Sequence, residues 1–114
     1  MLAATFSSAN FVGYVYETDG EIIGYIGADR VFETADILLV ATNASRRREG
    51  IATSLMNAVF KALKEEGTER ALLEVRRENA AAISLYEKCG FYPIGERKGY
   101  YGSGADAIIM EKKL

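Results

Sequence analysis

Residues 40–52 read Val-Ala-Thr-Asn-Ala-Ser-Arg-Arg-Arg-Glu-Gly-Ile-Ala, and they join an apolar strand to an amphipathic helix through a short basic turn. A helix N-terminus leaves unpaired N–H groups and a partial positive charge, which together attract anions. Gly50 and Ala52 have little or no side chain, so a phosphate can approach the backbone, and the three preceding arginines add donors. The stretch predicts a pyrophosphate-binding turn; a solvated basic turn that caps the helix is the alternative. It contains neither a Gly-Lys-Ser/Thr loop nor a Gly-x-Gly-x-x-Gly fingerprint.

The segments on either side of this turn alternate between strand and helix patterns. Residues 36–42 predict a strand with a nearly continuous apolar run. Apolar residues recur every four positions from Ile51 to Leu63, which predicts a helix that stops at Gly67. The other predicted elements are strands at 11–17, 21–27, 69–76, 91–97 and 105–111, and a helix from its cap Asn79 to about Lys88. The order β-β-β-α-β-α-β-β predicts an α/β fold with a mixed sheet, in a single domain of residues 1–114, with residues 1–10 as a lead.

The composition restricts the chemistry that the protein can use. The 114 residues are 49% apolar and 26% charged with a net charge of -2, as in a globular domain without a basic field for nucleic acid or an anionic membrane. There is no histidine, and Cys89 is the single cysteine, which argues against a metal site and excludes Ser-His and Cys-His pairs. The sequence has no leader pattern and no membrane-spanning apolar run, which predicts a cytoplasmic protein. Catalysis must therefore depend on carboxylate, tyrosine, backbone amides and a co-substrate.

Several polar residues in the second half are candidates for function. Glu74 lies in the middle of an apolar strand, where a carboxylate is either a general base at a cleft or the structural partner of an arginine such as Arg76. Asn79 is sufficiently explained as a helix cap. Tyr86 shares a helix face with apolar residues, as a core tyrosine does. Cys89 has the character of a small buried hydrophobic residue.

Three motifs, in order along the chain, carry a resemblance to a known family. Residues 47–52, Arg-Arg-Glu-Gly-Ile-Ala, resemble the Arg/Gln-x-x-Gly-x-Gly/Ala acyl-CoA signature of the GNAT acetyltransferase superfamily. Residues 73–91 resemble the Leu-Glu-Val-Arg…Asn-x-x-Ala-x-x-Leu-Tyr-x-x-x-Gly-Phe block of its RimI-type members, the ribosomal-protein alanine N-acetyltransferases. Residues 97–110 are similar to the ending of the same family.

The resemblance implies a GNAT fold and an acetyl-CoA-dependent N-acetyltransferase in which the amine attacks directly in a ternary complex. It also implies that the strands at 36–42 and 69–76 lie parallel and splay apart to admit the pantetheine. By resemblance, Glu74 accepts the proton of the amine and Tyr86 protonates the departing thiolate, while Tyr100 and Tyr101 hold the acceptor. The residues implied to bind acetyl-CoA are Val40, Ala41, Thr42, Arg47, Arg48, Glu49, Gly50, Ile51, Ala52, Thr53 and Asn79.

The acceptor that the resemblance implies is the N-terminal alanine of a ribosomal protein. The alternatives are an acetyltransferase for lysine or a small amine, and a non-catalytic subunit that binds acetyl-CoA. The family usually has a first strand and one or two helices before Phe11, and this sequence lacks them. Their absence predicts that residues 11–17 form an open sheet edge, through which a homodimer could assemble.

Overall fold

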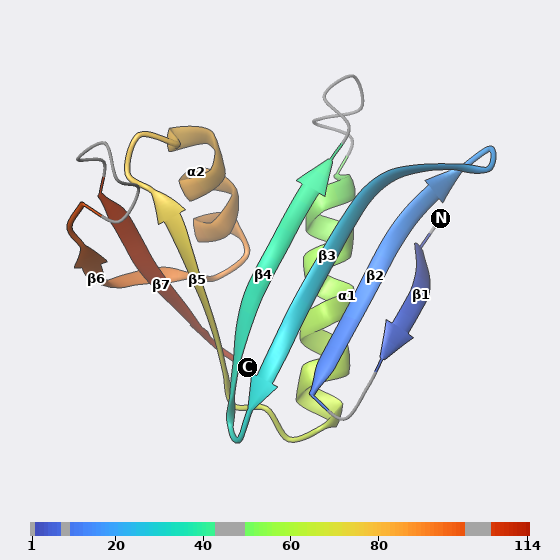
Figure 1. Cartoon of the computed structure of the whole chain (residues 1–114), viewed down its shortest axis with the longest axis horizontal. Coiled ribbons are helices and arrows are strands. Elements are labelled where there is room, and N and C mark those ends of the chain that lie inside the picture. Colours follow the sequence, from blue (N-terminus) through green and yellow to red (C-terminus); the bar gives the residue numbers. More distant parts are fainter. Residues whose placement is uncertain (1, 8–9, 43–49, 100–105) are drawn as a thin grey trace.

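The computed structural model describes residues 2–7, 10–42, 50–99 and 106–114. They form a single seven-stranded mixed sheet with two helices, which confirms the expected α/β architecture (Figure 1). In space the strands follow the order β1-β2-β3-β4-β5-β7-β6. The elements are β1 (Leu2–Ser7), β2 (Phe11–Thr18), β3 (Glu21–Val31), β4 (Thr34–Thr42), α1 (Ile51–Glu65), β5 (Arg70–Arg76), α2 (Ala80–Lys88), β6 (Tyr92–Arg97) and β7 (Ala107–Lys113).

Strand β1 corrects the expectation for the start of the chain, because residues 2–7 are part of the sheet rather than a lead. They pair antiparallel with β2, from Leu2 opposite Tyr16 to Ser7 opposite Val12. An unpaired β2 would leave a row of backbone N–H and C=O groups exposed, and a short segment returning along it satisfies them. The expected open edge at residues 11–17 is therefore wrong: β2 lies between β1 and β3. The weak apolar pattern of the segment gave little local sign of this pairing.

The first four strands form an antiparallel meander that local turn chemistry specifies. Asp19 and Gly20 both have positive φ, at 52° and 78°, as a two-residue hairpin turn between right-twisted strands requires. The predicted Asp-Gly hairpin is confirmed. Strand β3 extends beyond the predicted residue 27 to Val31, because its far end still pairs with both β2 and β4.

Both helices begin and end where the sequence predicts. Helix α1 buries Ile51, Leu55, Val59 and Leu63 along one face, and Gly67 follows its end with a φ of 87°. Helix α2 has Asn79 as its cap, and Gly90 follows it with a φ of 98°. Left-handed residues of this kind, for which glycine carries no steric penalty, commonly terminate helices.

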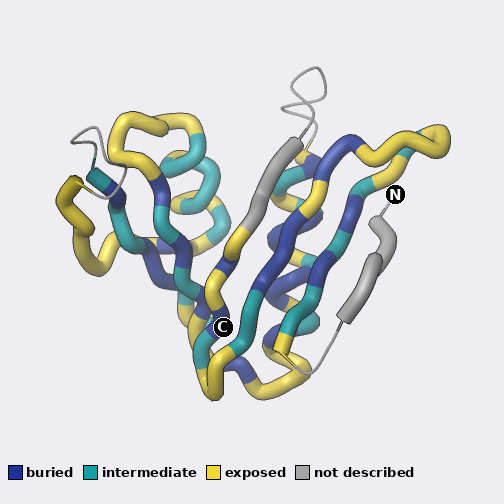
Figure 2. Tube along the Cα trace, in the orientation of Figure 1, coloured by how far each residue is buried: buried dark blue, intermediate teal, exposed yellow. Residues whose placement is uncertain are grey.

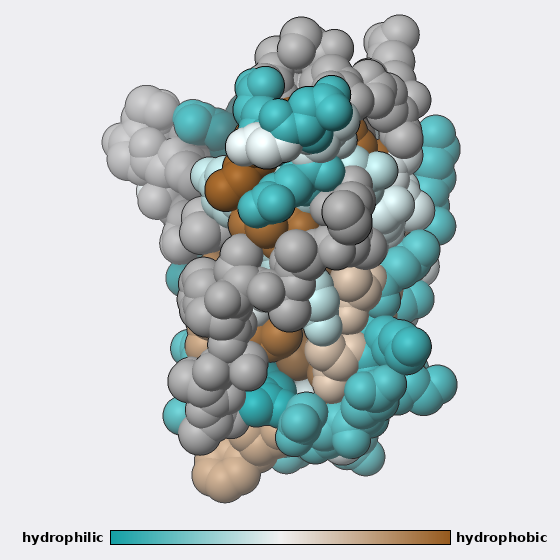
Figure 3. Space-filling view, turned by 90° about the vertical axis from the view of Figure 1, so that its right-hand side faces the viewer, coloured by the Kyte–Doolittle hydropathy of each residue, from teal (hydrophilic) through white to brown (hydrophobic). Residues whose placement is uncertain are grey.

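The core lies between α1 and one face of the sheet. Helix α1 packs behind β2, β3 and β4 in the view of Figure 1, and the buried residues gather along these central elements (Figure 2). The largest fully buried side chains are Leu55, Met56, Leu63, Met110 and Val59. Seen from the side of β1, the described surface is largely hydrophilic, with hydrophobic residues in small separate areas (Figure 3).

The second half of the sheet continues the first through one short parallel join. Strand β5 pairs with β4 at three positions only, from Thr34 opposite Arg70 to Asp36 opposite Leu72. On its other side β5 pairs with β7 along its whole length, and β7 pairs with β6 at the edge. At this side of the sheet Glu111 of β7 is buried, ion-paired with Arg70 at 3.2 Å, and accepts a hydrogen bond from the Tyr92 hydroxyl at 2.9 Å. The two halves therefore share a continuous sheet but diverge beyond Asp36.

Candidate functional site

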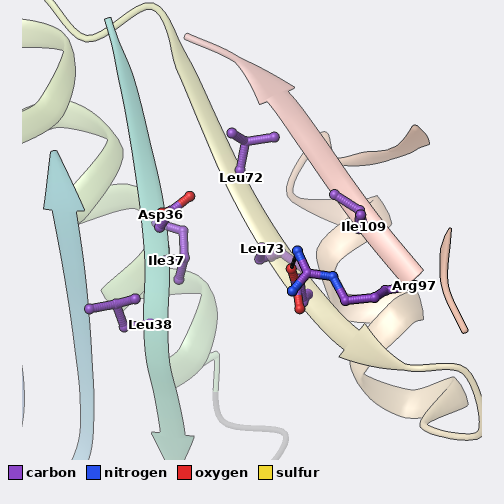
Figure 4. Close-up of a pocket in the computed structure, with 8 residues that line it drawn as sticks. Asp36, Ile37, Leu38, Leu72, Leu73, Arg97 and Ile109 are labelled. Atoms are coloured by element: carbon purple, nitrogen blue, oxygen red, sulfur yellow. Dashed lines mark ion pairs between the residues drawn. The ribbon is translucent and has the colours of Figure 1, made fainter. Parts of the chain in front are cut away.

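A cleft of about 610 Å³ opens where β4 and β5 diverge (Figure 4). The two strands run parallel from their three paired positions, and beyond Asp36 no described strand pairs with this edge of β4. The expectation that these strands lie parallel and splay apart is confirmed. The cleft is lined by Asp36, Ile37, Leu38, Leu72, Leu73, Glu74, Arg97 and Ile109.

An irregularity in β4 lies at the point where the strands separate. Gly27 of β3 pairs with Leu39 and the next residue pairs with Ile37, so that Leu38 is an extra residue on β4. A β-bulge of this kind bends its strand and re-aims nearby groups. Leu38 is exposed and lines the cleft. The bulge therefore helps to turn β4 away from β5.

Glu74 lies in the middle of β5 and lines this cleft. Its Oε1 lies 2.8 Å from Nη2 of Arg97, and the two side chains are 27% and 54% exposed. Its Oε2 is buried and has no hydrogen-bond partner among the described residues. The carboxylate thus lines a cleft and also pairs with an arginine, so both interpretations of Glu74 hold in part. The arginine is Arg97, not the Arg76 suggested from the sequence, which pairs with Glu78 at 3.5 Å.

Tyr86 lies on the other face of the sheet from Glu74. It is half-buried on α2 and packs against the hydrophobic core, with an edge-on contact to Phe91 at 6.0 Å between ring centroids. Burial, followed by the charge of the neighbouring Cys89 thiol, raises the pKa of Tyr86 above its usual 10.0. Its hydroxyl therefore stays protonated at neutral pH. A tyrosine of this kind can donate a proton but does not act as a base at that pH.

Cys89 is half-buried at the end of α2, near the start of α1. Burial raises the pKa of its thiol, against smaller opposing effects of Lys112 and of a hydrogen bond with Thr53. A thiol held in its protonated form is a poor nucleophile. The structure therefore supports a packing role for Cys89.

The N-terminus of α1 lies next to the end of β4, on the side where β4 and β5 are furthest apart (Figure 1). Gly50 precedes the helix with a φ of 76°, and a Cβ added there would meet nothing within 4 Å. The first intrahelical bond runs from Ser54 N to Gly50 O at 3.0 Å, and no side chain in the described part of the chain caps the helix. The N–H groups of Ile51, Ala52 and Thr53 have no partner within the helix. Space and donors for a phosphate are therefore present together.

The remaining predicted residues fall into two groups. Val40, Ala41 and Thr42 belong to β4 and pair with β3 on one side, from Ile26 to Gly24. Arg47, Arg48, Glu49, Tyr100 and Tyr101 lie outside the described residues. The Asp106 side chain accepts a hydrogen bond from Gly99 N, and the Asp106 carbonyl accepts one from Arg77 N, each at 3.0 Å.

Asn79 caps α2 as predicted, because its Oδ1 accepts a hydrogen bond from Ala82 N at 3.1 Å. Replacement by alanine should lower the free energy of unfolding by about 1 kcal/mol, since that N–H loses its partner. Aspartate at this position keeps the acceptor and should restore most of the loss. Urea unfolding of the three proteins measures both effects, and equal stability of the alanine variant would exclude a contribution from this cap.

Sequence reasoning missed Arg97 and Asp36 as parts of the site. Arg97 lies on β6, and β7 separates that strand from β5, so no spacing along the chain indicates its contact with Glu74. Asp36 belongs to a strand that was predicted only as an apolar run. Within the described ranges, no group of three or more His, Cys, Asp or Glu side chains could hold a metal ion. No helix in the same part of the chain is long and apolar enough to cross a membrane.

The sequence pattern of the Acetyltransferase (GNAT) family matches residues 2–91, which include both walls of the cleft and the start of α1. The chain belongs to this family. It is an acetyl-CoA-dependent N-acetyltransferase with the GNAT fold.

Two curated relatives are named as N-acetyltransferases. The N-alpha-acetyltransferase of Sulfurisphaera tokodaii is 35% identical, over 89% of this chain and 68% of its own length. A putative [ribosomal protein bS18]-alanine N-acetyltransferase of Bacillus subtilis is 38% identical, over 84% of this chain and 64% of its own length. The chain therefore spans about two thirds of the length of these relatives.

Two solved structures show the same fold. The ribosomal-protein-S18-alanine N-acetyltransferase from Escherichia coli superposes with a TM-score of 0.86 at 29% identity, over 95% of this chain and 72% of that one. A putative streptothricin acetyltransferase from Bacillus anthracis, solved with acetyl coenzyme A, superposes with a TM-score of 0.87 at 25% identity, over 94% and 64%. The acyl donor of this GNAT protein is acetyl-CoA.

Proposed function

We propose that this GNAT acetyltransferase modifies the α-amino group at the N-terminus of a protein, and that its acceptor is the N-terminal alanine of a ribosomal protein. The observation that carries the proposal is Glu74, whose carboxylate lines the cleft with one oxygen unpaired among the described residues. An α-amino group has a pKa of about 8, against about 10.4 for lysine. A carboxylate is a weak base and suits the more easily deprotonated amine.

The relatives support the same class of acceptor. Curated proteins from Sulfurisphaera tokodaii and Saccharolobus solfataricus are named N-alpha-acetyltransferases. Those from Bacillus subtilis and Escherichia coli are named for the alanine of ribosomal protein bS18. Relatives that are at least 30% identical to the chain over the aligned residues are thus named for acetylation of an α-amino group or of an alanine.

Acetyl-CoA fits the features at the wide end of the cleft. The pyrophosphate would lie against the N–H groups of Ile51, Ala52 and Thr53, where Gly50 leaves space, with Arg47, Arg48 and Glu49 in the adjoining turn. The pantetheine would pair with the unpaired edge of β4 at Val40, Ala41 and Thr42. Asn79 would contribute its side-chain amide from the cap of α2. Bound there, acetyl-CoA supplies the acetyl group as a reactive thioester.

The protein's own residues then divide the proton transfers between the two faces of the sheet. Glu74 Oε2 would accept the proton of the amine, directly or through one water, on the face away from the helices. Tyr86 Oη would return a proton to the departing sulfur from the helix face, where its hydroxyl stays protonated. A backbone N–H at the edge of β4 would donate to the carbonyl oxygen of the reacting group. Donor and acceptor would thus approach from opposite sides.

A panel of acceptors tests the proposal. The chain is incubated with acetyl-CoA and equal amounts of peptides that begin with Ala or Ser, a peptide whose only free amine is lysine, and a polyamine, and products are quantified by mass spectrometry. We expect kcat/KM for the Ala peptide to exceed that for the lysine peptide by at least about tenfold, from the difference in free amine at neutral pH. A preference for lysine or the polyamine would replace the proposal with the second acceptor class. Acetyl-CoA binding without turnover of any amine would indicate a non-catalytic subunit.

A further inference from the structure

The contact between Arg97 and Glu74 is long-range and crosses an intervening strand. Arg97 is the last residue of β6 and lies opposite Ala107 of β7, which in turn lies opposite Arg76 of β5. Glu74 is two residues before Arg76 and therefore on the same face. Strands two apart are about 10 Å from each other, so only a long side chain can span β7. The small Ala107 beside it leaves this path open.

The pair leaves the two oxygens of Glu74 in different situations. Oε1 is held by the guanidinium of Arg97 at 2.8 Å, while Oε2 is buried without a hydrogen-bond partner among the described residues. A buried carboxylate oxygen without a partner is uncommon and calls for an explanation. Figure 4 shows the Arg97 guanidinium at the cleft wall, near the apolar Leu73 and Ile109. Arg97 thus fixes the orientation in which the carboxylate meets the cleft.

A purely stabilising role does not account for this arrangement. Arg97 is 54% exposed, and ion pairs with a solvent-exposed partner contribute little to stability. Arg97 also pairs with Oε1 alone, which leaves Oε2 without a hydrogen-bond partner among the described residues. A group that orients a catalytic carboxylate affects the rate more than the fold, because small misplacements are costly in an active site.

We infer that Arg97 is a positioning residue for acetyl transfer: it holds Oε1 of Glu74, so that Oε2 is the oxygen presented to the acceptor amine or its water. The inference rests on the proposed role of Glu74 as the base. Arg97 itself transfers no proton, because a guanidinium stays charged in proteins. Its effect on the reaction passes through Glu74 and should vanish when Glu74 can no longer accept a proton.

A double-mutant cycle tests this coupling. R97Q, E74Q and the double variant are assayed with acetyl-CoA and an Ala-terminal peptide, next to R97K and the control Lys98→Gln. Lys98 is 80% exposed and pairs with Glu96 at 3.8 Å, so K98Q removes the same charge from the next residue without touching the cleft. We expect R97Q to lower kcat about tenfold with little change in KM for acetyl-CoA, R97K to recover part of the loss, and K98Q to match the wild type. In a protein that already carries E74Q, adding R97Q should not lower kcat any further.

An NMR measurement reports the surroundings of the Glu74 carboxylate independently of the rate of acetyl transfer. In the ligand-free protein, the ¹³Cδ resonance of Glu74 should move in R97Q and stay in place in K98Q, with unfolding midpoints of both variants close to wild type. An unchanged kcat in R97Q beside a reduced kcat in E74Q would overturn the role of Arg97 alone. An equal loss from R97Q with and without Glu74 would show that Arg97 acts by another route. An unchanged kcat in E74Q would remove the proposed base and this inference with it.

Discussion

Replacement of Glu74 by glutamine lowers kcat by about 100-fold or more, while KM for acetyl-CoA stays within a factor of about two; this is the largest effect that we expect. Glutamine keeps the shape of the side chain, and its amide oxygen can still accept a hydrogen bond from Arg97. What it loses is the ability to take a proton from the amine. The effect should therefore appear in kcat, because the helix N-terminus and the edge of β4 that would hold acetyl-CoA remain intact.

Glu111→Gln is the matched control for this variant. Glu111 faces the same side of the sheet as Glu74. It pairs with Arg70 and accepts a hydrogen bond from the Tyr92 hydroxyl, but it does not line the cleft. The same change there should lower stability and leave kcat of the folded protein unchanged. Steady-state kinetics at saturating peptide measures kcat, and circular dichroism measures the folded fraction, so the effects on catalysis and on stability can be told apart. Equal kcat for wild type and Glu74→Gln would remove Glu74 from the role of base.

Replacement of Tyr86 by phenylalanine should reduce kcat by about 100-fold. Phenylalanine retains the aromatic contact with Phe91, so stability should change little. It has no hydroxyl to give a proton to the departing sulfur. Burial raises the pKa of the Tyr86 hydroxyl, so the wild type should keep its rate through neutral pH and lose it only as pH rises through that raised pKa. A pH profile of kcat for both proteins measures this, and the alkaline decline should be absent from the phenylalanine variant.

Tyr92→Phe provides the comparison for Tyr86. It removes one hydroxyl that donates to Glu111 at 2.9 Å, and it should leave both kcat and the alkaline decline as in the wild type. If Tyr86→Phe behaved in the same way as Tyr92→Phe, water would have to supply the proton and Tyr86 would be a packing residue. The acid and base assignments can thus fail independently.

The features that the sequence predicts are those with local causes. The Asp19-Gly20 turn, the period of α1 and the cap at Asn79 each depend on residues within one or two turns of each other, and all three are confirmed. The divergence of β4 from β5 followed from the family resemblance and is confirmed as well. The roles of Glu74 and Tyr86 stay predictions.

The features that the sequence does not predict depend on distant parts of the chain. Strand β1 forms because β2 offers it an edge, and its own residues carry little strand pattern. The contact from Arg97 to Glu74 exists because β7 inserts between β5 and β6, a strand order that differs from the order in the chain. Nothing in the spacing of these residues encodes that insertion. Both the formation of β1 and the contact between Arg97 and Glu74 thus depend on how strands pair in the folded sheet.

The three-position join between β4 and β5 has a consequence for how the fold and its ligand depend on each other. Three paired positions supply few hydrogen bonds between the two halves of the sheet. A molecule that fills the cleft contacts residues of both β4 and β5, and so adds contacts across this join. Binding energy is then also folding energy, since a ligand that recognises only the native state stabilises it by mass action. Acetyl-CoA bound in the cleft would therefore stabilise the folded state as well as supply the acetyl group.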